Sequence, residues 1–418
     1  MTQTIDKNKF KKNFLWNVIG MTCNCFNSLF FMILITRINS MDDAGIFTLS
    51  FSIACLVYYI GTYAGRVYQV TNVNDSITDS DFIIHRAITC VMMIFISLMY
   101  CFISGYSLYK FTVVILLCIY KSLEAFSDVL YGVVQKNNNL YQVGISLTIK
   151  SVFALILFVV VDIVTRNIIY SILFAILAWI LVIVLYDFKN VNYVSKFKLH
   201  FNISSLRDIF KNGFFVFIIN FLSSYIVNAP KYALDGRASN ELQAIFGIIL
   251  MPATLISLGV QYFIQPFLEQ LTSSFKNNDK KAFNKVVIKL LFITSGLGVI
   301  CLIGAYILGI PVLSLVYGLE LSAYLFELEI IIFGSILFAL SLILSSALIT
   351  VRYNFIQFIV FVITSVFGFF ISIILITRFS IDGAAYAYSC IMLLEFFLYG
   401  LIYLMLQKNL FKNLEKEV

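Results

Sequence analysis

The segment DFKNVNYVSKFKLHFNISSLRD, from Asp187 to Asp208, divides this sequence of 418 residues almost in half. It is basic and polar, and hydrophobic runs lie on both sides of it. Six such runs precede it and six follow it, each of roughly 20 apolar residues, which is long enough to cross a bilayer. We therefore predict an all-α integral membrane protein with about twelve transmembrane helices.

The composition supports this prediction. Hydrophobic residues make up 61% of the chain and charged residues 12%, whereas a soluble domain is about half apolar and a quarter charged. No connection between the runs is long enough to form a soluble catalytic domain. The predicted spans are 14–36, 44–69, 83–105, 110–134, 141–162, 167–187, 209–230, 242–268, 286–309, 324–350, 354–377 and 383–406.

The basic residues predict the orientation. When the connections are assigned alternately to two sides, the side that holds the N-terminus carries 21 of the 29 Lys and Arg residues, and the other side carries 6. Such an excess marks the cytoplasmic side, so we expect both termini in the cytoplasm. The net charge of +7 then reflects loops that face anionic headgroups rather than nucleic acid.

The two halves resemble each other at their starts. NFLWN at 13–17 and DDAGIF at 42–47 correspond to NGFF at 212–215 and ELQAIF at 241–246, about 200 residues later. Because six spans is an even number, both halves would enter the membrane in the same direction. We predict two six-helix bundles, 1–190 and 208–418, joined by a cytoplasmic linker at 191–207, with a parallel repeat and a central cleft between the halves.

Charged residues within the fourth and fifth spans form a candidate site. Lys121, Glu124 and Asp128 share one helix face, because their spacing is i, i+3 and i+7. Lys150 lies at a similar depth in the next span, so we expect it to reach Glu124 or Asp128 and to leave Lys121 without a full partner. A buried charge needs a partner or a cavity. These residues either pin two helices together or bind substrate or a coupling ion.

Further polar residues lie within other spans. Glu395 is alone near the middle of the last span, where it either carries a proton or pairs with another helix. Uncharged polar residues recur on one face of three spans. They are Asn13, Asn17, Asn24 and Ser28 in the first span, Asn220, Ser224 and Asn228 in the seventh, and Gln243, Thr254, Gln261 and Gln265 in the eighth. They indicate either a wet cleft or helix packing.

The chain lacks the motifs of nucleotide or metal chemistry. It has no phosphate-binding Gly-rich loop and no cluster of metal ligands. Its eight cysteines lie in or beside apolar runs, as small packing residues do. We expect no cofactor and no metal, and transport driven by an ion gradient or by the substrate's own gradient.

Several short segments resemble a known family, and they are spread over most of the chain. The segments are NFLWN at 13–17, TRI at 36–38, DAGIF at 43–47, YAGRVYQ at 63–69, NAPKYALD at 228–235, FGI at 246–248, MPA at 251–253 and DGAA at 382–385. They resemble bacterial flippases for O-antigen and capsular-polysaccharide repeat units, the polysaccharide transport branch of the multidrug/oligosaccharidyl-lipid/polysaccharide exporter superfamily. The motifs are typical of the branch rather than of one glycan.

The resemblance implies an activity and a location. It implies a transporter and not an enzyme. This transporter would move undecaprenyl-diphosphate-linked oligosaccharide from the cytoplasmic to the outer leaflet of the bacterial cytoplasmic (inner) membrane by alternating access. The product would supply O-antigen, lipopolysaccharide, capsule or exopolysaccharide synthesis. The implied partners are this substrate, membrane lipid, and the polymerase and chain-length machinery of the same pathway.

A diphosphate substrate needs cations within the cleft. Three candidates lie in the family-like segments: Arg37, Arg66 and Lys231. Lys121 and Lys150 are candidates by their depth, and Arg237 follows the seventh span. Arg66 could instead extend to the headgroups. Glu124, Asp128 and Glu395 are the candidates for ion coupling.

Other transport and enzyme classes fit less well. An ion-coupled multidrug exporter of the same superfamily would need a cleft dominated by acidic residues, whereas here the charges are mixed. A membrane polysaccharide polymerase would need a large outward loop, and the outward loops here are short. A peptidoglycan-precursor flippase typically has fourteen spans, two more than predicted here.

Overall fold

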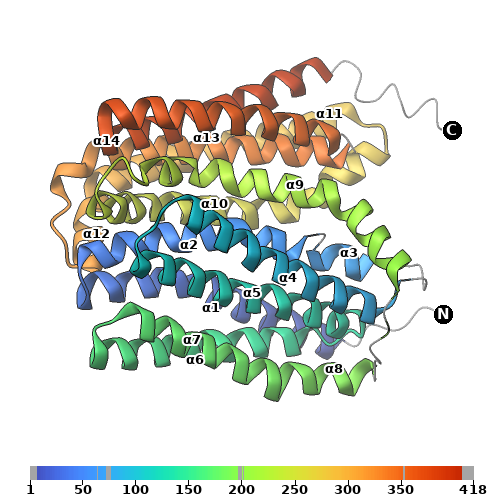
Figure 1. Cartoon of the computed structure of the whole chain (residues 1–418). Helices are drawn as coiled ribbons and strands as arrows, with labels where there is room; N and C mark the ends of the chain where they lie inside the picture. Colours follow the sequence, from blue (N-terminus) through green and yellow to red (C-terminus); the bar gives the residue numbers. More distant parts are fainter. Residues whose placement is uncertain are drawn as a thin grey trace. The chain divides into compact units, whose positions relative to one another are not determined.

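A computed structural model of the chain describes residues 7–63, 65–71, 77–195, 200, 202–351 and 354–406. Within these ranges every regular element is a helix, and no strand occurs (Figure 1). This confirms the predicted all-α fold. In a membrane only helices and closed barrels satisfy all backbone hydrogen bonds, so long apolar runs can fold in few other ways.

The described residues contain many helices that could span a membrane, and the count of twelve stays a prediction. Ten helical segments of the described residues are long and apolar enough to cross a membrane. The helix α5 (Leu108–Lys136) has the required length but carries several charges. The helix α14 (Asn354–Leu406) is long enough for two spans, and it bends sharply at Ser380, whose φ is 52° and ψ is −122°. The chain is therefore a multi-pass membrane protein.

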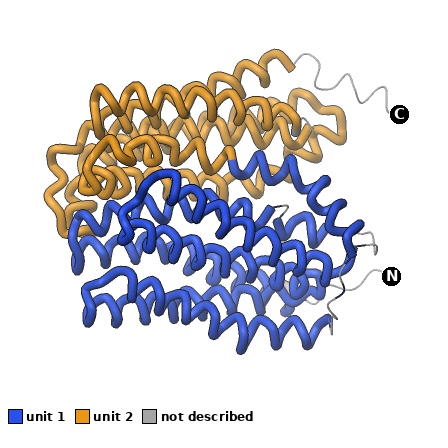
Figure 2. The backbone as a smooth tube through the Cα atoms, in the orientation of Figure 1, with its two compact units in different colours: residues 1–221 blue, residues 222–418 orange. Residues whose placement is uncertain are grey.

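The contacts group the chain into two units, residues 1–221 and 222–418 (Figure 2). The boundary falls inside α9 (Ile203–Leu234), not in the predicted linker at 191–207. Residues 196–199 and 201 of that linker lie outside the described residues. The predicted domain limits and the parallel repeat remain predictions.

The first part of α9 belongs to unit 1 because aromatic side chains attach it there. The hydroxyl of Tyr63 donates a hydrogen bond to the carbonyl of Phe210 at 3.1 Å. The Tyr63 ring also stacks on Phe217, with centroids 5.0 Å apart. The ring of buried His85 lies 4.4 Å from that of Phe210. These long-range contacts could not be predicted from hydropathy.

Helix α5 is the central helix of unit 1. It packs on α2, α3, α4, α6, α7 and α8, whereas α1 packs mainly on α6. The other elements of this unit are α1 (Lys7–Ile38), α2 (Met41–Thr62), α3 (Gly65–Thr71), α4 (Asp79–Ile103), α6 (Leu140–Thr165), α7 (Ile168–Val182), the π-helix η1 (Ile183–Asp187) and α8 (Phe188–Ser195).

Helix α13 (Leu325–Thr350) has the equivalent place in unit 2. It packs on α10, α11 and α14. It is the fourth predicted span of the second half, as α5 is the fourth of the first half. The remaining elements are α10 (Asn240–Lys276), α11 (Lys280–Gly304), the π-helix η2 (Ala305–Gly309), α12 (Ile310–Tyr317) and the short η3 (Ser322–Tyr324).

Local sequence sets where several of these helices begin. Ser40 caps α2 and forms a capping box with Asp43, and Thr78 with Asp81 does the same for α4. Each box satisfies backbone N–H groups that have no partner within the helix. Helix α4 therefore begins at residue 79, four residues before the predicted span.

Two glycines allow α1 and α6 to touch along their backbones. A Cβ atom on Gly20 would lie 2.4 Å from the carbonyl oxygen of Gly144. A Cβ on Gly144 would lie 2.0 Å from the carbonyl oxygen of Trp16. Small residues at such crossings are how membrane helices pack closely without a hydrophobic driving force.

We expect Gly144→Leu to separate α1 from α6 and to destabilise unit 1 by about 1–3 kcal/mol or more, the usual range for overpacking. A fluorescence-detected melt in detergent would show a lower Tm. Gly259→Leu in α10 is the matched control, because a Cβ there meets nothing within 4 Å. Equal Tm values for the two variants would contradict the close crossing.

Candidate functional site

A group of six polar side chains lies on and around the central helix of unit 1. We call it the α5 polar cluster. Its members come from four helices, and each member described below contacts at least one other or a neighbouring backbone carbonyl. They are Asn24 of α1, Arg66 of α3, Arg86 of α4, and Lys121, Glu124 and Asp128 of α5.

One part of the cluster is centred on Glu124. Lys121 Nζ lies 2.7 Å from Glu124 Oε2, and Asn24 Nδ2 donates to Glu124 Oε1 at 3.0 Å. Lys121 Nζ also lies 5.0 Å from the centroid of the Phe51 ring, within the range of a cation–π contact. Lys121 therefore has a full partner one turn away on its own helix, and the expectation that it lacks one is wrong.

The other part is centred on Asp128. Arg66 Nε lies 3.6 Å from Asp128 Oδ1, and Arg86 Nη2 lies 3.5 Å from Asp128 Oδ2. Arg86 Nη1 also donates to the carbonyl of Gly61 at 3.2 Å. Asp128 thus accepts two guanidinium partners, of which Arg86 is the more firmly held.

Helix α3 positions Arg66 through a contact with α5. The Gln69 side chain lies against Gly132, where a Cβ would come within 2.0 Å of Gln69 Oε1. Gln69 Nε2 donates to the carbonyl of Val129 at 3.2 Å. This contact holds the first turn of α3 over the Asp128 carboxylate.

The cluster is partly exposed and carries an excess of positive charge. The Arg66 side chain is 25% exposed and that of Lys121 is 14% exposed. Three cations face two carboxylates, so one positive charge is in excess when all are ionised. At an effective dielectric constant near 20, charges 4 Å apart interact by about 4 kcal/mol. An anion that enters the cluster can therefore compete with the carboxylates.

Lys150 does not belong to this cluster. Its ammonium pairs with Asp187 of η1, and the prediction that it reaches Glu124 or Asp128 is wrong. It also donates to Ser127 Oγ at 2.7 Å and to Tyr131 Oη at 2.9 Å. Because the Lys150 side chain is 0% exposed, this position favours the structural alternative, and a substrate role for Lys150 remains only a prediction.

The partner of Lys150 was missed for a structural reason. Asp187 ends the predicted sixth span and begins the polar segment 187–208, so it was not counted among the charges within the membrane. The π-helical turn η1 adds a residue to the helical turn and places Asp187 in the bundle interior, with 3% of its side chain exposed. Such turns occur often at functional or strained positions.

Arg86 was also missed as a site residue. It lies near the start of the predicted span 83–105 and was counted with the basic residues of the cytoplasmic side, yet its side chain is 4% exposed. The signal that could have found it is the capping box of Thr78 and Asp81. That box starts α4 at residue 79, so Arg86 lies about two turns inside the helix.

The other predicted residues lie outside the α5 polar cluster. Arg37 is exposed at the end of α1, and Asn220 is half-buried in α9. In unit 2, Lys231 and Asn228 are half-buried and Gln261 is exposed. Asn228 Nδ2 donates a hydrogen bond to the carbonyl of Ser224 at 3.0 Å, and Arg237 Nη1 donates one to the carbonyl of Ala233 at 3.0 Å. Their substrate roles remain predictions.

Glu395 lies in the interior of unit 2. Its Oε1 accepts a hydrogen bond from Ser341 Oγ of α13 at 3.1 Å, and its Oε2 has no hydrogen-bond partner among the described residues. Its side chain is buried. This contact joins Glu395 to another helix, which was one of the two predicted alternatives. The partner is a hydroxyl group and not a cation. Proton carriage by Glu395 remains a prediction.

The whole chain is similar to proteins of known sequence and structure. No protein-family model matches the sequence. One curated relative is the capsular polysaccharide biosynthesis protein CapF of Staphylococcus aureus, which is 25% identical over 381 residues. The alignment covers 90% of this chain and 94% of that protein.

Several solved structures of transporters resemble this chain. An inward-facing multidrug resistance MATE family transporter of the MOP superfamily gives a TM-score of 0.74 at 10% identity, covering 95% of this chain and 99% of that one. The chain shares the fold of that structure. The lipid II flippase MurJ, inward closed, gives 0.71 at 16% identity, covering 93% and 87%. The MATE transporter VcmN of Vibrio cholerae gives 0.64 at 13% identity, covering 98% and 100%.

The buried ion pair of Lys150 and Asp187 leads to a prediction about stability. Lys150→Met should destabilise unit 1 by about 3–5 kcal/mol, because it leaves the Asp187 carboxylate buried without a partner. The double variant Lys150→Met/Asp187→Leu should recover much of this loss, since it removes both charges. Denaturant unfolding in detergent micelles measures each variant.

A matched comparison is Lys121→Met, whose partner Glu124 is partly exposed and keeps Asn24. We expect a smaller loss of stability there than for Lys150→Met. The single variants Lys150→Met and Asp187→Leu each lose some free energy of unfolding. If the loss in the double variant equals the sum of these two losses, the side chains do not interact directly.

Proposed function

We propose that this protein flips diphosphate-linked oligosaccharides, carried on a polyprenyl lipid such as undecaprenol, to the outer leaflet for capsule or related surface polysaccharide. The observation that carries the proposal is the alignment with a capsular polysaccharide biosynthesis protein along 90% of the chain. The MOP transporter fold and the excess positive charge of the α5 polar cluster support it.

The proposed binding step is an exchange of anions. A diphosphate that enters the α5 polar cluster takes the place of the carboxylates beside Lys121 and Arg66. These two cations are partly exposed, and the contact between Arg66 and Asp128 is long, at 3.6 Å. Arg86 stays on Asp128, because the Gly61 carbonyl also holds it. Hydrogen bonds between two charged groups are among the stronger ones in proteins.

The exchange also gives the acidic residues a role. When Lys121 turns to the diphosphate, Glu124 keeps only the Asn24 amide as a neutral donor. An ionised carboxylate left in this state within a membrane is costly. We propose that Glu124 then takes up a proton or a small cation, which couples substrate binding to an ion gradient.

A second candidate function is the ion-coupled export of cationic drugs. The MATE structures favour it on fold alone, and Glu124 and Asp128 would be its binding groups. The two functions differ in which residues contact the cargo. A cationic drug would displace Lys121 and Arg66 from the carboxylates, whereas a diphosphate would displace the carboxylates from Lys121 and Arg66.

The proposal includes a setting in the cell. The protein would lie in the bacterial cytoplasmic membrane with both termini in the cytoplasm, as the distribution of basic residues predicts. Its product would pass to the polymerase and chain-length machinery of the same pathway. A central cleft between the two halves and alternating access belong to this proposal as well.

The test is deletion of the gene followed by mass spectrometry of lipid-linked oligosaccharides. We expect a complete repeat unit to accumulate on its carrier and surface polysaccharide to be lost. The wild-type gene should restore export. Lys121→Gln and Arg66→Gln should lower it about tenfold or more, the cost of losing a hydrogen bond to a charged group.

Lys211→Gln and Arg166→Gln are the matched controls, because both side chains are exposed and outside the α5 polar cluster. Immunoblots should show equal amounts of every variant in the membrane. Unchanged polysaccharide and lipid intermediates in the deletion strain, with increased susceptibility to cationic drugs, would contradict the proposal and favour the exporter.

A further inference from the structure

A depression of about 600 Å³ lies on the surface of α11 in unit 2. We call it the α11 lysine pocket. All its lining residues come from the first half of α11, and half of them are lysines. They are Lys281, Asn284, Lys285, Ile288, Lys289 and Phe292.

The pattern along α11 places these lysines on one face. Phe283, Val287 and Leu290 are buried in a core cluster with residues of α10, α13 and α14. Lys281, Lys285 and Lys289 are exposed and follow at steps of four residues. Each step rises about 6 Å along the helix axis. The three ammonium groups therefore form a row away from the core.

Other contacts hold this part of α11 in place. Tyr403 Oη of α14 donates to Asn284 Oδ1 at 2.7 Å. Lys289 Nζ lies 5.8 Å from the centroid of the Phe267 ring of α10. The row is thus carried by a packed helix, so the backbone positions of the three lysines are fixed before any ligand arrives.

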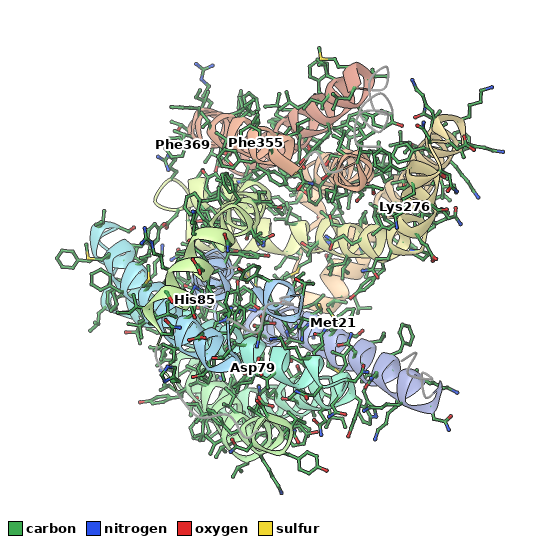
Figure 3. All side chains as sticks on the ribbon, turned by 90° about the vertical axis from the view of Figure 1, so that its right-hand side faces the viewer. Met21, Asp79, His85, Lys276, Phe355 and Phe369 are labelled. Atoms are coloured by element: carbon green, nitrogen blue, oxygen red, sulfur yellow. The ribbon has the colours of Figure 1, made fainter. Side chains whose placement is uncertain are left out.

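In the part of the chain that the structure describes, no carboxylate pairs with the lysine row. Asp279, the nearest acidic residue in sequence, caps the helix by accepting from the backbone N–H of Ala282 at 2.9 Å. Lys276 and Lys280 add further positive charge, and Figure 3 shows several nitrogen-tipped side chains projecting outward around Lys276.

Apolar side chains lie beside the charges. Ile288 is 62% exposed and Phe292 is 80% exposed, and both are on the side of the pocket that leads into the apolar part of α11. A soluble anion would use only the lysines. A phospholipid would use both parts, with its phosphate on the lysines and its acyl chain along Ile288 and Phe292.

We propose that the α11 lysine pocket binds the phosphate group of an anionic membrane phospholipid. The charge complementarity and the adjoining apolar side chains identify this ligand. The site lies outside the α5 polar cluster and does not depend on the proposed cargo. Its occupant would anchor this end of α11 at the cytoplasmic surface of the bilayer.

The test is native mass spectrometry of the whole protein released from nanodiscs. One set of nanodiscs contains phosphatidylcholine with phosphatidylglycerol, and the other contains phosphatidylcholine alone. We expect the wild type to retain phosphatidylglycerol. The triple variant Lys281→Gln/Lys285→Gln/Lys289→Gln should bind it at least about tenfold more weakly, since each lysine near an anionic surface contributes to binding. The triple Lys→Arg variant should retain it.

The matched control is Lys11→Gln/Lys189→Gln/Lys211→Gln, which removes the same charge at exposed positions of unit 1, outside the pocket. Equal loss in this control would overturn the proposal, because it would show a general charge effect. Displacement of the lipid by millimolar inorganic diphosphate would overturn it too, since the pocket would then take any phosphate. Retention of phosphatidylglycerol by the triple Lys→Gln variant would also overturn the proposal, because the lysines would then not hold the lipid.

Discussion

The cost of an ionised side chain within hydrocarbon governs unit 1. A charge there must have a partner or contact water, and the fold brings partners together from α1, α3, α4, α5, α6 and η1. Asp128 has two guanidinium groups, Glu124 has an ammonium and an amide, and Lys150 has Asp187. Because α5 carries several of these residues, it must be the central helix of the unit.

These pairs differ in what they can do. Lys150 and Asp187 are closed to solvent, and hydroxyl groups complete the coordination of the ammonium. Such a pair fixes the packing of α5, α6 and η1. The pairs in the α5 polar cluster are partly exposed and have longer or exchangeable contacts. The same physical rule therefore yields a structural pair and, a few turns away, a candidate site for an anionic cargo.

Hydropathy predicts most of the fold, because long apolar runs in a membrane must be helical. The polar pairing was harder to predict. Lys121, Glu124 and Asp128 share a face as their spacing requires, but the partner of Lys150 depends on a π-helical turn that no sequence pattern announces. Arg86 depends on where α4 begins. The attachment of α9 to unit 1 depends on Tyr63 and Phe210, which are far apart in sequence.

The central claim is that the protein moves a lipid-linked diphosphate across a bilayer through the α5 polar cluster. The most direct measurement uses purified protein in vesicles that carry a fluorescent lipid-linked oligosaccharide, with a membrane-impermeant quencher added outside. The account predicts that wild-type protein makes nearly all of the lipid accessible with time, and that Arg66→Gln and Lys121→Gln leave the inner-leaflet fraction protected. Equal protection in wild-type and protein-free vesicles, under an imposed ion gradient, would contradict it.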